Sequence, residues 1–458
     1  MADAVIAGRV QFAFTIMFHY LFPVLTMGLG VLIAVLKTIQ LRTGDDRYGS
    51  AARFWARIFA VTFAAGVVTG IPMEFQFGTN WSRFSHFAGG VVGQTLFMEG
   101  VFAFFAESSF LGIFLFAEGR VRPGVHWLAS VMVAAGAVLS GYFIVATDAW
   151  MQHPVGFEIV NGRAQLTSLW ALVSNPYVRW QYPHVISGSM ITASMVMAGI
   201  GAYYLLARRH VALGLVSVRV GVVAGVIFSL FSLFPSGSLL GETVTRYQPV
   251  KMATMEGLFE TQSGAPLAII GMPDTERRQL LDPIYVPRLL SYVAYGDFRA
   301  TVVGLNDYPE DVRPPMEIVY YAYHIMVGLG TIFITVLAGA ALLLWRRRLF
   351  EARWYLWILM LAMPFPYIAN QAGWLVGEVG RQPWVVYGLQ RTADATSTNV
   401  SGGMTVFTLL GFMGLYTVLA ILYLFLCARI VARGTDDAHG GAVAGGAAGP
   451  GLQPEARS

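Results

Sequence analysis

Long apolar runs restrict the fold of this chain more than any other feature. Hydrophobic residues make up 56% of the sequence and charged residues 12%, whereas charged residues make up about a quarter of an ordinary soluble domain. A run of about 20 apolar residues is long enough to cross a bilayer as a helix. Nine such runs occur, at residues 12–36, 54–73, 92–117, 126–147, 184–207, 216–240, 316–345, 354–376 and 403–431. The sequence therefore predicts an all-α fold, a polytopic membrane helical bundle with nine transmembrane helices.

The distribution of lysine and arginine predicts the orientation of this bundle. The short loops on one side carry fourteen Lys and Arg residues, and those on the other side carry six, with the long loop 241–315 set aside. Because cytoplasmic loops are enriched in positive residues, we expect the N-terminus outside and the C-terminus in the cytoplasm. The net charge of +4 then reflects topology, and we expect no nucleic-acid partner.

The chain divides into one large membrane domain and a short tail. Residues 1–433 are expected to form a single membrane-embedded domain, since no internal repeat is found. Within it, the loop 241–315 is too long for a simple connector, and loops of this size are usually functional. We expect it to be an extramembrane lid on the outer face. Residues 434–458 are rich in Gly and Ala and are predicted to be disordered.

Candidate ligands for a redox centre must be His, Met or carboxylate, because the single cysteine, Cys427, offers no Cys-based metal site. His19, His184 and His324 lie in or at the outer ends of apolar runs. Met326 follows His324 by two residues, so the two side chains point to roughly opposite sides of a helix. One cofactor face is therefore expected to use only one of this pair.

The predicted orientation places these candidates in one layer near the outer face, together with Glu99 and Glu378. His19 is expected about two turns into its helix, roughly 10–15 Å below the surface. A single intramembrane histidine is more often a satisfied polar residue than a haem ligand. Several candidate ligands in a shared layer, however, favour a cofactor.

Two carboxylates lie in the third apolar run. Glu107 follows Glu99 by eight residues, a spacing that gives about 12 Å of rise and turns the side chain by only about 80°. Both carboxylates can then line one side of a passage and serve as a proton relay. The structural alternative is that they neutralise Arg57 or other basic residues.

The segment Asn370–Trp384 carries the highest density of functional residue types. It places Glu378, Arg381, Trp374 and Trp384 at the end of an apolar run. An ionisable residue in such a position suggests a functional site. The structural alternative is an ion pair between Glu378 and Arg381 beside an interfacial belt of tryptophans.

This segment resembles the Gly-Trp…Glu-x-Gly-Arg-Gln-Pro-Trp signature of subunit I of the cytochrome bd family of quinol oxidases. Further motifs resemble the family in the same order and extend the resemblance to about residue 430. These motifs are Gly8–Phe14 with His19, Met73–Ser82 as a characteristic loop, Glu99–Phe110, Trp150–Gly156, His184–Gly188 and Met326–Gly330.

The resemblance implies three haems in this subunit, namely two haem b and one haem d, or a third haem b in place of haem d. His184 and Met326 would ligate a low-spin haem b. His19 and Glu378 would each bind one of two high-spin haems, with Glu99 on or near one of them. Which of the two reduces oxygen varies within the family. Two further groups would act in the catalytic site: Trp374, expected between haems, and Arg381.

The resemblance also implies a quinol site in the long loop. Lys251 and Glu256 match the family's quinol-loop residues, with Glu256 suited to accept a proton and Lys251 to donate one. Without the resemblance they would be an ordinary solvated pair. The loop lacks a long insertion, and it is similar to the short-loop branch that includes the cyanide-insensitive oxidases.

One position departs from better-known relatives, which carry Arg two residues before the Met ligand. Here that residue is His324, which can titrate or coordinate iron, whereas Arg is a permanent cation. The departure leaves His324 as a second candidate for binding the low-spin haem.

The implied activity is oxidation of quinol (ubiquinol or menaquinol) at the outer face and reduction of O2 to water with cytoplasmic protons. Protons would rise past Glu107 and Glu99, which generates a proton-motive force without pumping. The implied location is the bacterial plasma membrane. The implied partners are the lipid membrane, a cytochrome bd-type subunit II and, in some members, a small single-helix subunit.

A second hypothesis is a haem-free polytopic transporter or channel that uses Glu99 and Glu107 to conduct protons or cations. The absence of the inverted repeats that transporters often contain and the presence of a full ligand set argue against it.

Overall fold

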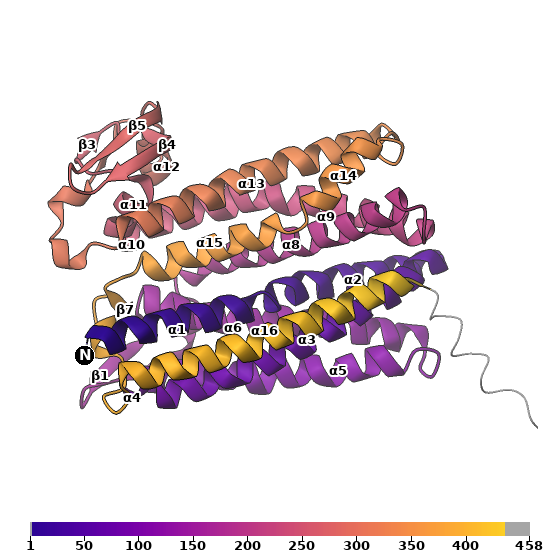
Figure 1. Cartoon of the computed structure of the whole chain (residues 1–458), viewed down its shortest axis with the longest axis horizontal. Helices are drawn as coiled ribbons and strands as arrows, with labels where there is room; N and C mark the ends of the chain where they lie inside the picture. The colour runs from indigo at the N-terminus through magenta and orange to yellow at the C-terminus, as the bar shows by residue number, and fades with distance from the viewer. Residues whose placement is uncertain (1, 436–458) are drawn as a thin grey trace, which may run out of the picture.

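The computed structural model describes residues 2–435, and its helices run side by side along the long axis of the molecule (Figure 1). The predicted disordered tail, 434–458, lies outside the described residues except for its first two positions. The fold is mostly helical rather than entirely so, because short strands form four two-stranded antiparallel sheets. These pair β1 (Phe157–Val160) with β2 (Arg163–Leu166), β3 (Gln262–Ser263) with β6 (Thr301–Val302), β4 (Leu267–Asp274) with β5 (Gln279–Val286), and β7 (Trp384–Val386) with β8 (Gln390–Arg391).

Within residues 2–435, eight helical spans are long and apolar enough to cross a membrane. They comprise α1 (Ala2–Tyr20) with α2 (Pro23–Thr43), α3 (Asp46–Thr79), α4 (Ser82–Met98) with α5 (Phe105–Phe116), α6 (Pro123–Gln152), α8 (Val178–Leu206), α9 (Val211–Phe231) with α10 (Ser238–Tyr247), α13 (Met316–Trp345) and α16 (Gly402–Arg433).

The predicted count of nine is not confirmed, because the expected span 354–376 is interrupted. It consists of α14 (Arg353–Leu361) and α15 (Phe365–Val379), which meet at a break that contains Pro364 (Figure 1). Neither helix reaches the roughly 20 residues that a crossing requires. Helices α14 and α15 therefore run in different directions (Figure 1).

Three other spans are interrupted, and each interruption lies at or beside a candidate residue, with Ser236 of the third one next to His184. The turn at residues 21–22 separates α1 from α2 and follows His19. A π-helical segment, η1 (Glu99–Phe104), joins α4 to α5, and a second, η2 (Ser232–Gly237), joins α9 to α10. Such π segments occur often at functional sites.

The helices begin earlier than the apolar runs. His19 and Glu99 each lie 17 residues beyond the first residue of their helical span, a rise of about 25 Å from the start of the helix. His184 lies six residues into α8. The expected loop Met73–Ser82 is also largely helical, since α3 continues to Thr79.

The long loop is a compact subdomain at one end of the bundle. The preceding helix, α10, continues to Tyr247, beyond the predicted loop start at 241. Beyond it lie α11 (Pro249–Glu256), the β4–β5 hairpin, α12 (Leu289–Tyr295) and two short 3-10 turns, Leu305–Asp307 and Glu310–Val312. The hairpin projects past the end of α13 (Figure 1). Apolar residues of α11 pack against Met316 and Tyr320 of α13, which fixes the loop to the bundle.

Burial distinguishes the centre of the bundle from its periphery. In the most apolar part of α8, 78% of the residues are buried, whereas the value for α16 is 6%. Close approach to α8 depends on small residues. A Cβ added to Gly28 of α2 would lie 2.4 Å from the carbonyl oxygen of Ser189. Helix α8 is therefore the packing centre, and α16 presents most of its apolar surface outward.

Candidate functional site

Helix α15 carries most of the segment Asn370–Trp384 and contacts the end of α1. The side-chain amide of Gln371 donates to the carbonyl oxygen of Met17 at 2.6 Å. The rings of Trp374 and Tyr20 meet edge to face, with centroids 5.4 Å apart. Trp374 therefore lies directly beside the residue that follows His19.

Two glycines of α15 allow side chains from other elements to approach its backbone. A Cβ on Gly373 would lie 3.0 Å from Sδ of Met326, and one on Gly380 would lie 2.6 Å from Cε of Lys251. Glycine is not needed at these two positions for an unusual backbone conformation. It is needed because a Cβ would collide with the approaching side chains. One short segment thus touches the predicted low-spin ligand and the predicted quinol-binding lysine.

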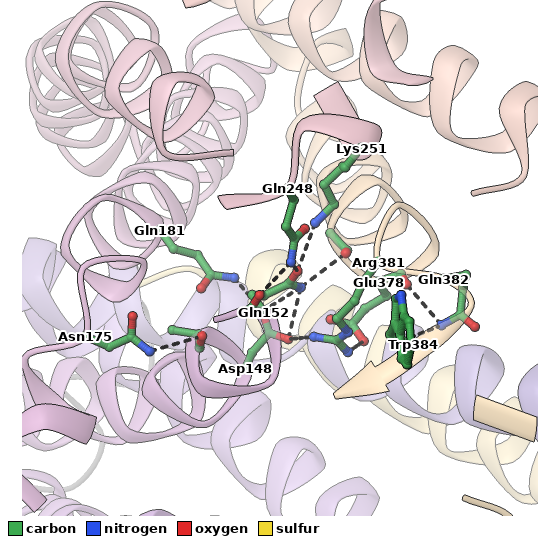
Figure 2. Close-up of polar contacts among 12 residues, drawn as sticks. Asp148, Gln152, Asn175, Gln181, Gln248, Lys251, Glu378, Arg381, Gln382 and Trp384 are labelled. Carbon is green, nitrogen blue, oxygen red and sulfur yellow. Dashed lines mark hydrogen bonds and ion pairs between the residues drawn. The ribbon is translucent and has the colours of Figure 1, made fainter. Parts of the chain in front are cut away.

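Arg381 is the centre of a buried charge cluster (Figure 2). Its guanidinium is 1% exposed and donates to Oδ1 of Asp148 at 2.7 Å and to Oε2 of Glu378 at 2.5 Å. The predicted structural pair between Glu378 and Arg381 is therefore present. It does not use all of Glu378, because Oε1 is buried without a hydrogen-bond partner within residues 2–435. Two carboxylates share one cation, and one carboxylate oxygen is left available.

A chain of buried amides connects this cluster to the long loop (Figure 2). Gln181 donates to Oδ2 of Asp148 at 2.5 Å. Gln152, the last residue of α6, lies between Asp148 and Lys251, whose Nζ donates to Oε1 of Gln152 at 2.9 Å. Gln248 donates to the same oxygen, also at 2.9 Å. The loop and the charge cluster are thus parts of one hydrogen-bonded unit.

Lys251 and Glu256 are not a solvated pair, so that alternative is wrong. Each is only 2% exposed. Burial, together with the nearby Arg381, lowers the pKa of Lys251 to about 7. Burial raises the pKa of Glu256 to about 7. Neither carboxylate oxygen of Glu256 has a hydrogen-bond partner in the described chain, and the Tyr323 hydroxyl lies near it but outside hydrogen-bonding geometry.

The two predicted histidine ligands share one arrangement. Nδ1 of His19 lies 3.0 Å from the Thr69 hydroxyl, and Nδ1 of His184 lies 3.4 Å from the Ser236 hydroxyl. Each hydroxyl donates its own proton to a backbone carbonyl, so it can accept from the ring. An imidazole that donates from Nδ1 presents an unprotonated Nε2, and metal-bound histidines are usually oriented in this way.

His324 is arranged differently from these two histidines. Its Nδ1 lies 2.8 Å from the carbonyl oxygen of Tyr320, and its Nε2 lies 3.1 Å from that of Ala268 in β4. Both ring nitrogens therefore face backbone oxygens. Met326, on the other side of α13, directs its sulfur toward Gly373. Of this pair, only Met326 has a donor atom that does not face a backbone oxygen.

Glu99 and Glu107 both face α6. Ser140 donates to Oε1 of Glu99 at 2.6 Å, and a Cβ on Gly136 would lie 2.8 Å from Cβ of Glu107. Gly136 and Ser140 are one turn apart on α6, so the two carboxylates lie along the same face. Glu107 is 5% exposed and has no ion-pair partner among residues 2–435.

Sequence reasoning missed Asp148, Gln152, Gln181 and Gln248. Asp148 and Gln152 lie just beyond the end of the apolar run 126–147, where polar residues are ordinary. The available signal was the spacing of four between them, which places both on one helix face. Only the fold shows that this face meets Arg381 and Lys251.

Comparison with known proteins places these observations in context. Residues 7–435 match the family described as cytochrome bd terminal oxidase subunit I. The chain is 38% identical to the cytochrome bd ubiquinol oxidase subunit 1 of Bacillus subtilis (strain 168), covering 96% of each chain. It is 31% identical to the cytochrome bd-II ubiquinol oxidase subunit 1 of Escherichia coli (strain K12), covering 95% of this chain and 97% of the relative. Its fold is similar to the bd oxidase structure from Geobacillus thermodenitrificans, with a TM-score of 0.88, 33% identity, and coverage of 94% of this chain and 99% of that one.

Proposed function

This chain belongs to the cytochrome bd terminal oxidase subunit I family, and on that premise we propose how its residues carry out quinol oxidation and oxygen reduction. The chain is a subunit of a quinol oxidase, a multi-pass membrane oxidoreductase. Membership of an oxidase family argues against the haem-free transporter. The assignments below concern the haem ligands, the quinol site and the proton path.

The donor atoms of the site fit haem. His184 and Met326 would hold the low-spin haem b, because Nε2 and Sδ are the atoms left free when Nδ1 faces Ser236 and the methionine lies against a glycine. His19 and Glu378 would each hold one high-spin haem through Nε2 and the unpartnered Oε1. The availability of these donor atoms is the observation that carries the proposal. His324, with both ring nitrogens at carbonyl oxygens, fixes the β4 strand to α13 rather than serving as a ligand.

When bound, haem supplies one-electron redox chemistry and the iron at which O2 is reduced. The set is two haem b and one haem d, or a third haem b in place of haem d. Glu99 would lie on or near a high-spin haem. Trp374 would lie between haems, which its contact with Tyr20 and its position next to Gly373 support. Arg381 orients Glu378 by holding one of its two carboxylate oxygens.

The quinol site is formed by Lys251 and Glu256 on α11. Oxidation of a quinol releases two protons as well as two electrons, and Glu256 accepts a proton with a buried carboxylate that lies near the Tyr323 hydroxyl. A general base works best when its pKa is close to the working pH, which the pKa of about 7 satisfies. Lys251 donates a hydrogen bond to a quinol oxygen. The loop belongs to the short-loop branch of the family.

Protons for oxygen reduction pass along α6. Glu107, buried beside Gly136, delivers them to Glu99, which Ser140 holds. We assign the N-terminus to the outside and the C-terminus to the cytoplasm of the bacterial plasma membrane. Quinol protons then leave outside while oxygen is reduced with cytoplasmic protons, so a proton-motive force forms without pumping.

The chain works beside a cytochrome bd-type subunit II, with a small single-helix subunit as a further component. The outward apolar surface of α16, with 6% of its most apolar part buried, supports a membrane or subunit neighbour. Quinol, as ubiquinol or menaquinol, and O2 are the substrates.

The ligand assignment is tested by the visible spectrum and haem content of purified variants. His184→Ala and Met326→Leu should each abolish the low-spin haem signal, because each removes one of the two residues that would hold its iron. His324→Ala is the matched control on the same helix and should retain that signal. A six-coordinate low-spin haem in Met326→Leu, lost instead in His324→Ala, would reverse the assignment.

A further inference from the structure

Gln152 is held on both sides of its amide by buried groups (Figure 2). It is 0% exposed. Its Oε1 accepts from Nζ of Lys251 and from Nε2 of Gln248, each at 2.9 Å. Its Nε2 lies 3.4 Å from each carboxylate oxygen of Asp148 and donates to the carbonyl oxygen of Gly377 at 3.2 Å.

These partners allow only one orientation of the amide. The oxygen faces two donors, and the nitrogen faces a carboxylate and a carbonyl. Rotating the amide by half a turn would place its NH2 group against the amine of Lys251, and its oxygen against the carboxylate of Asp148. Each contact would become donor to donor or acceptor to acceptor. Asp148 on one side therefore fixes the position of Oε1 on the other.

Lys251 has no other side-chain hydrogen bond in the part of the chain that the structure describes. Its stem lies against Gly380, where a Cβ would come within 2.6 Å of Cε. The stem is thus confined by packing, while the direction of Nζ is set by Gln152. The amine keeps N–H groups to donate whether it is charged or neutral.

We propose that Gln152 is a positioning residue for quinol oxidation, which aims Nζ of Lys251 at the quinol site and anchors it to the Asp148–Arg381 pair. This inference rests on the proposed quinol-binding role of Lys251. It adds a requirement on α6, outside the loop that carries the quinol site. Gln152 itself touches neither quinol nor haem in this role.

The direct test measures steady-state quinol oxidation by Gln152→Leu in the assembled oxidase. We expect KM for quinol to rise about 10-fold, the scale of a lost hydrogen bond to a charged group. The haem spectrum should be unchanged, and so should oxygen consumption with an artificial donor that reduces the haems directly. Gln181→Leu is the matched control, because Gln181 also donates to Asp148 but does not touch Lys251. Its KM should stay within about 2-fold of the native value.

A double variant separates positioning from general damage. If Gln152 acts through Lys251, adding Gln152→Leu to Lys251→Ala should not raise KM further, because coupled residues are not additive. Gln152→Asn, which is one methylene shorter, should also raise KM and serves if the leucine variant does not assemble.

The inference is overturned by an unchanged KM in a haem-replete Gln152→Leu enzyme, by an equal rise in Gln181→Leu, or by additivity in the double variant. The proposed function fails separately. Unchanged quinol kinetics in Lys251→Ala would remove Lys251 from the quinol site, whereas impaired Lys251→Ala with normal Gln152→Leu would contradict only the positioning role.

Discussion

Two pairs of buried carboxylates in this bundle have very different surroundings. Asp148 and Glu378 share the guanidinium of Arg381, with contacts of 2.7 and 2.5 Å. Glu99 and Glu107 both face α6. Ser140 of α6 donates a hydrogen bond to Glu99, and Glu107 has no cation beside it within residues 2–435. The first pair is held by a fixed charge, and the second is not.

The difference indicates different tasks. A carboxylate hydrogen-bonded to a buried arginine is held in one position, which suits a ligand that must keep one geometry. A buried carboxyl group without a cation can exist as the neutral acid, because burial disfavours the charged form. Such a group can take up and release a proton without breaking an ion pair. The contrast thus supports a fixed binding role for Glu378 and the proposed proton relay at Glu99 and Glu107.

Removing the shared cation should have the largest effect. Arg381→Leu leaves two carboxylates buried together, and breaking a buried ion pair costs about 3–5 kcal/mol. We expect poor assembly and a much lower thermal midpoint of the purified protein. Arg391→Leu is the control, because Arg391 forms a surface pair with Asp311 of the kind that contributes at most about 1 kcal/mol. Equal destabilisation by both substitutions would refute the special status of the Arg381 cluster.

The next largest effect comes from replacing one carboxylate of each pair with the neutral amide, which should affect the two pairs differently. Glu107→Gln removes a proton acceptor but keeps size and polarity, so oxygen reduction should slow by about 100-fold, the lower end of the scale for lost proton transfer. All haems should remain. Glu378→Gln should instead remove or alter one high-spin haem. Haem quantification with rapid mixing of the reduced enzyme and O2 separates these outcomes. Full turnover of Glu107→Gln would refute the relay.

The sequence predicts most of this arrangement because membrane helices have strong signals. The apolar runs identified every long helix, and the outer motif identified Glu378, Arg381 and Trp374 as neighbours on one short segment. Helix ends were less predictable. Polar helical turns such as 241–247 carry no hydropathy signal, and the break at Pro364 lies within an apolar run.

The partners of the charged residues could not be predicted, because they come from distant segments. Asp148 and Arg381 are 233 residues apart, and Gln152 and Lys251 are 99 apart. The π segments are equally hidden, since an apolar run does not distinguish them from an α-helix. Glu99 and His184 were identified as candidates, but the η1 and η2 segments beside them came only from the fold.

The quinol site provides a pH test of a carboxylate that lies outside both pairs. Burial raises the pKa of Glu256 to about 7, so it is protonated below pH 7 and cannot accept a proton there. Its ionised fraction rises about 10-fold between pH 6 and pH 8. The rate of quinol oxidation should therefore rise through pH 7. Glu256→Gln should be slower and lose this rise, with haem content unchanged. A rise that persists in the variant would assign it to another group.

The smallest expected effect concerns the hydroxyls that orient the two histidine rings. Thr69 lies 3.0 Å from Nδ1 of His19, and Ser236 lies 3.4 Å from Nδ1 of His184. Losing such a partner typically weakens binding of the bound group by about 10- to 100-fold, and the shorter contact should matter more.

Thr69→Val keeps the shape of the side chain and should release the high-spin haem held by His19 more readily in a haem-transfer assay. Ser236→Ala should release the low-spin haem only slightly faster than the native protein, because Met326 remains as a second ligand and η2 still packs against the ring. Faster haem release from Ser236→Ala than from Thr69→Val would show that hydrogen-bond length does not rank these two sites. Ser236 of the π segment would then contribute more to holding His184 than the contact distances indicate.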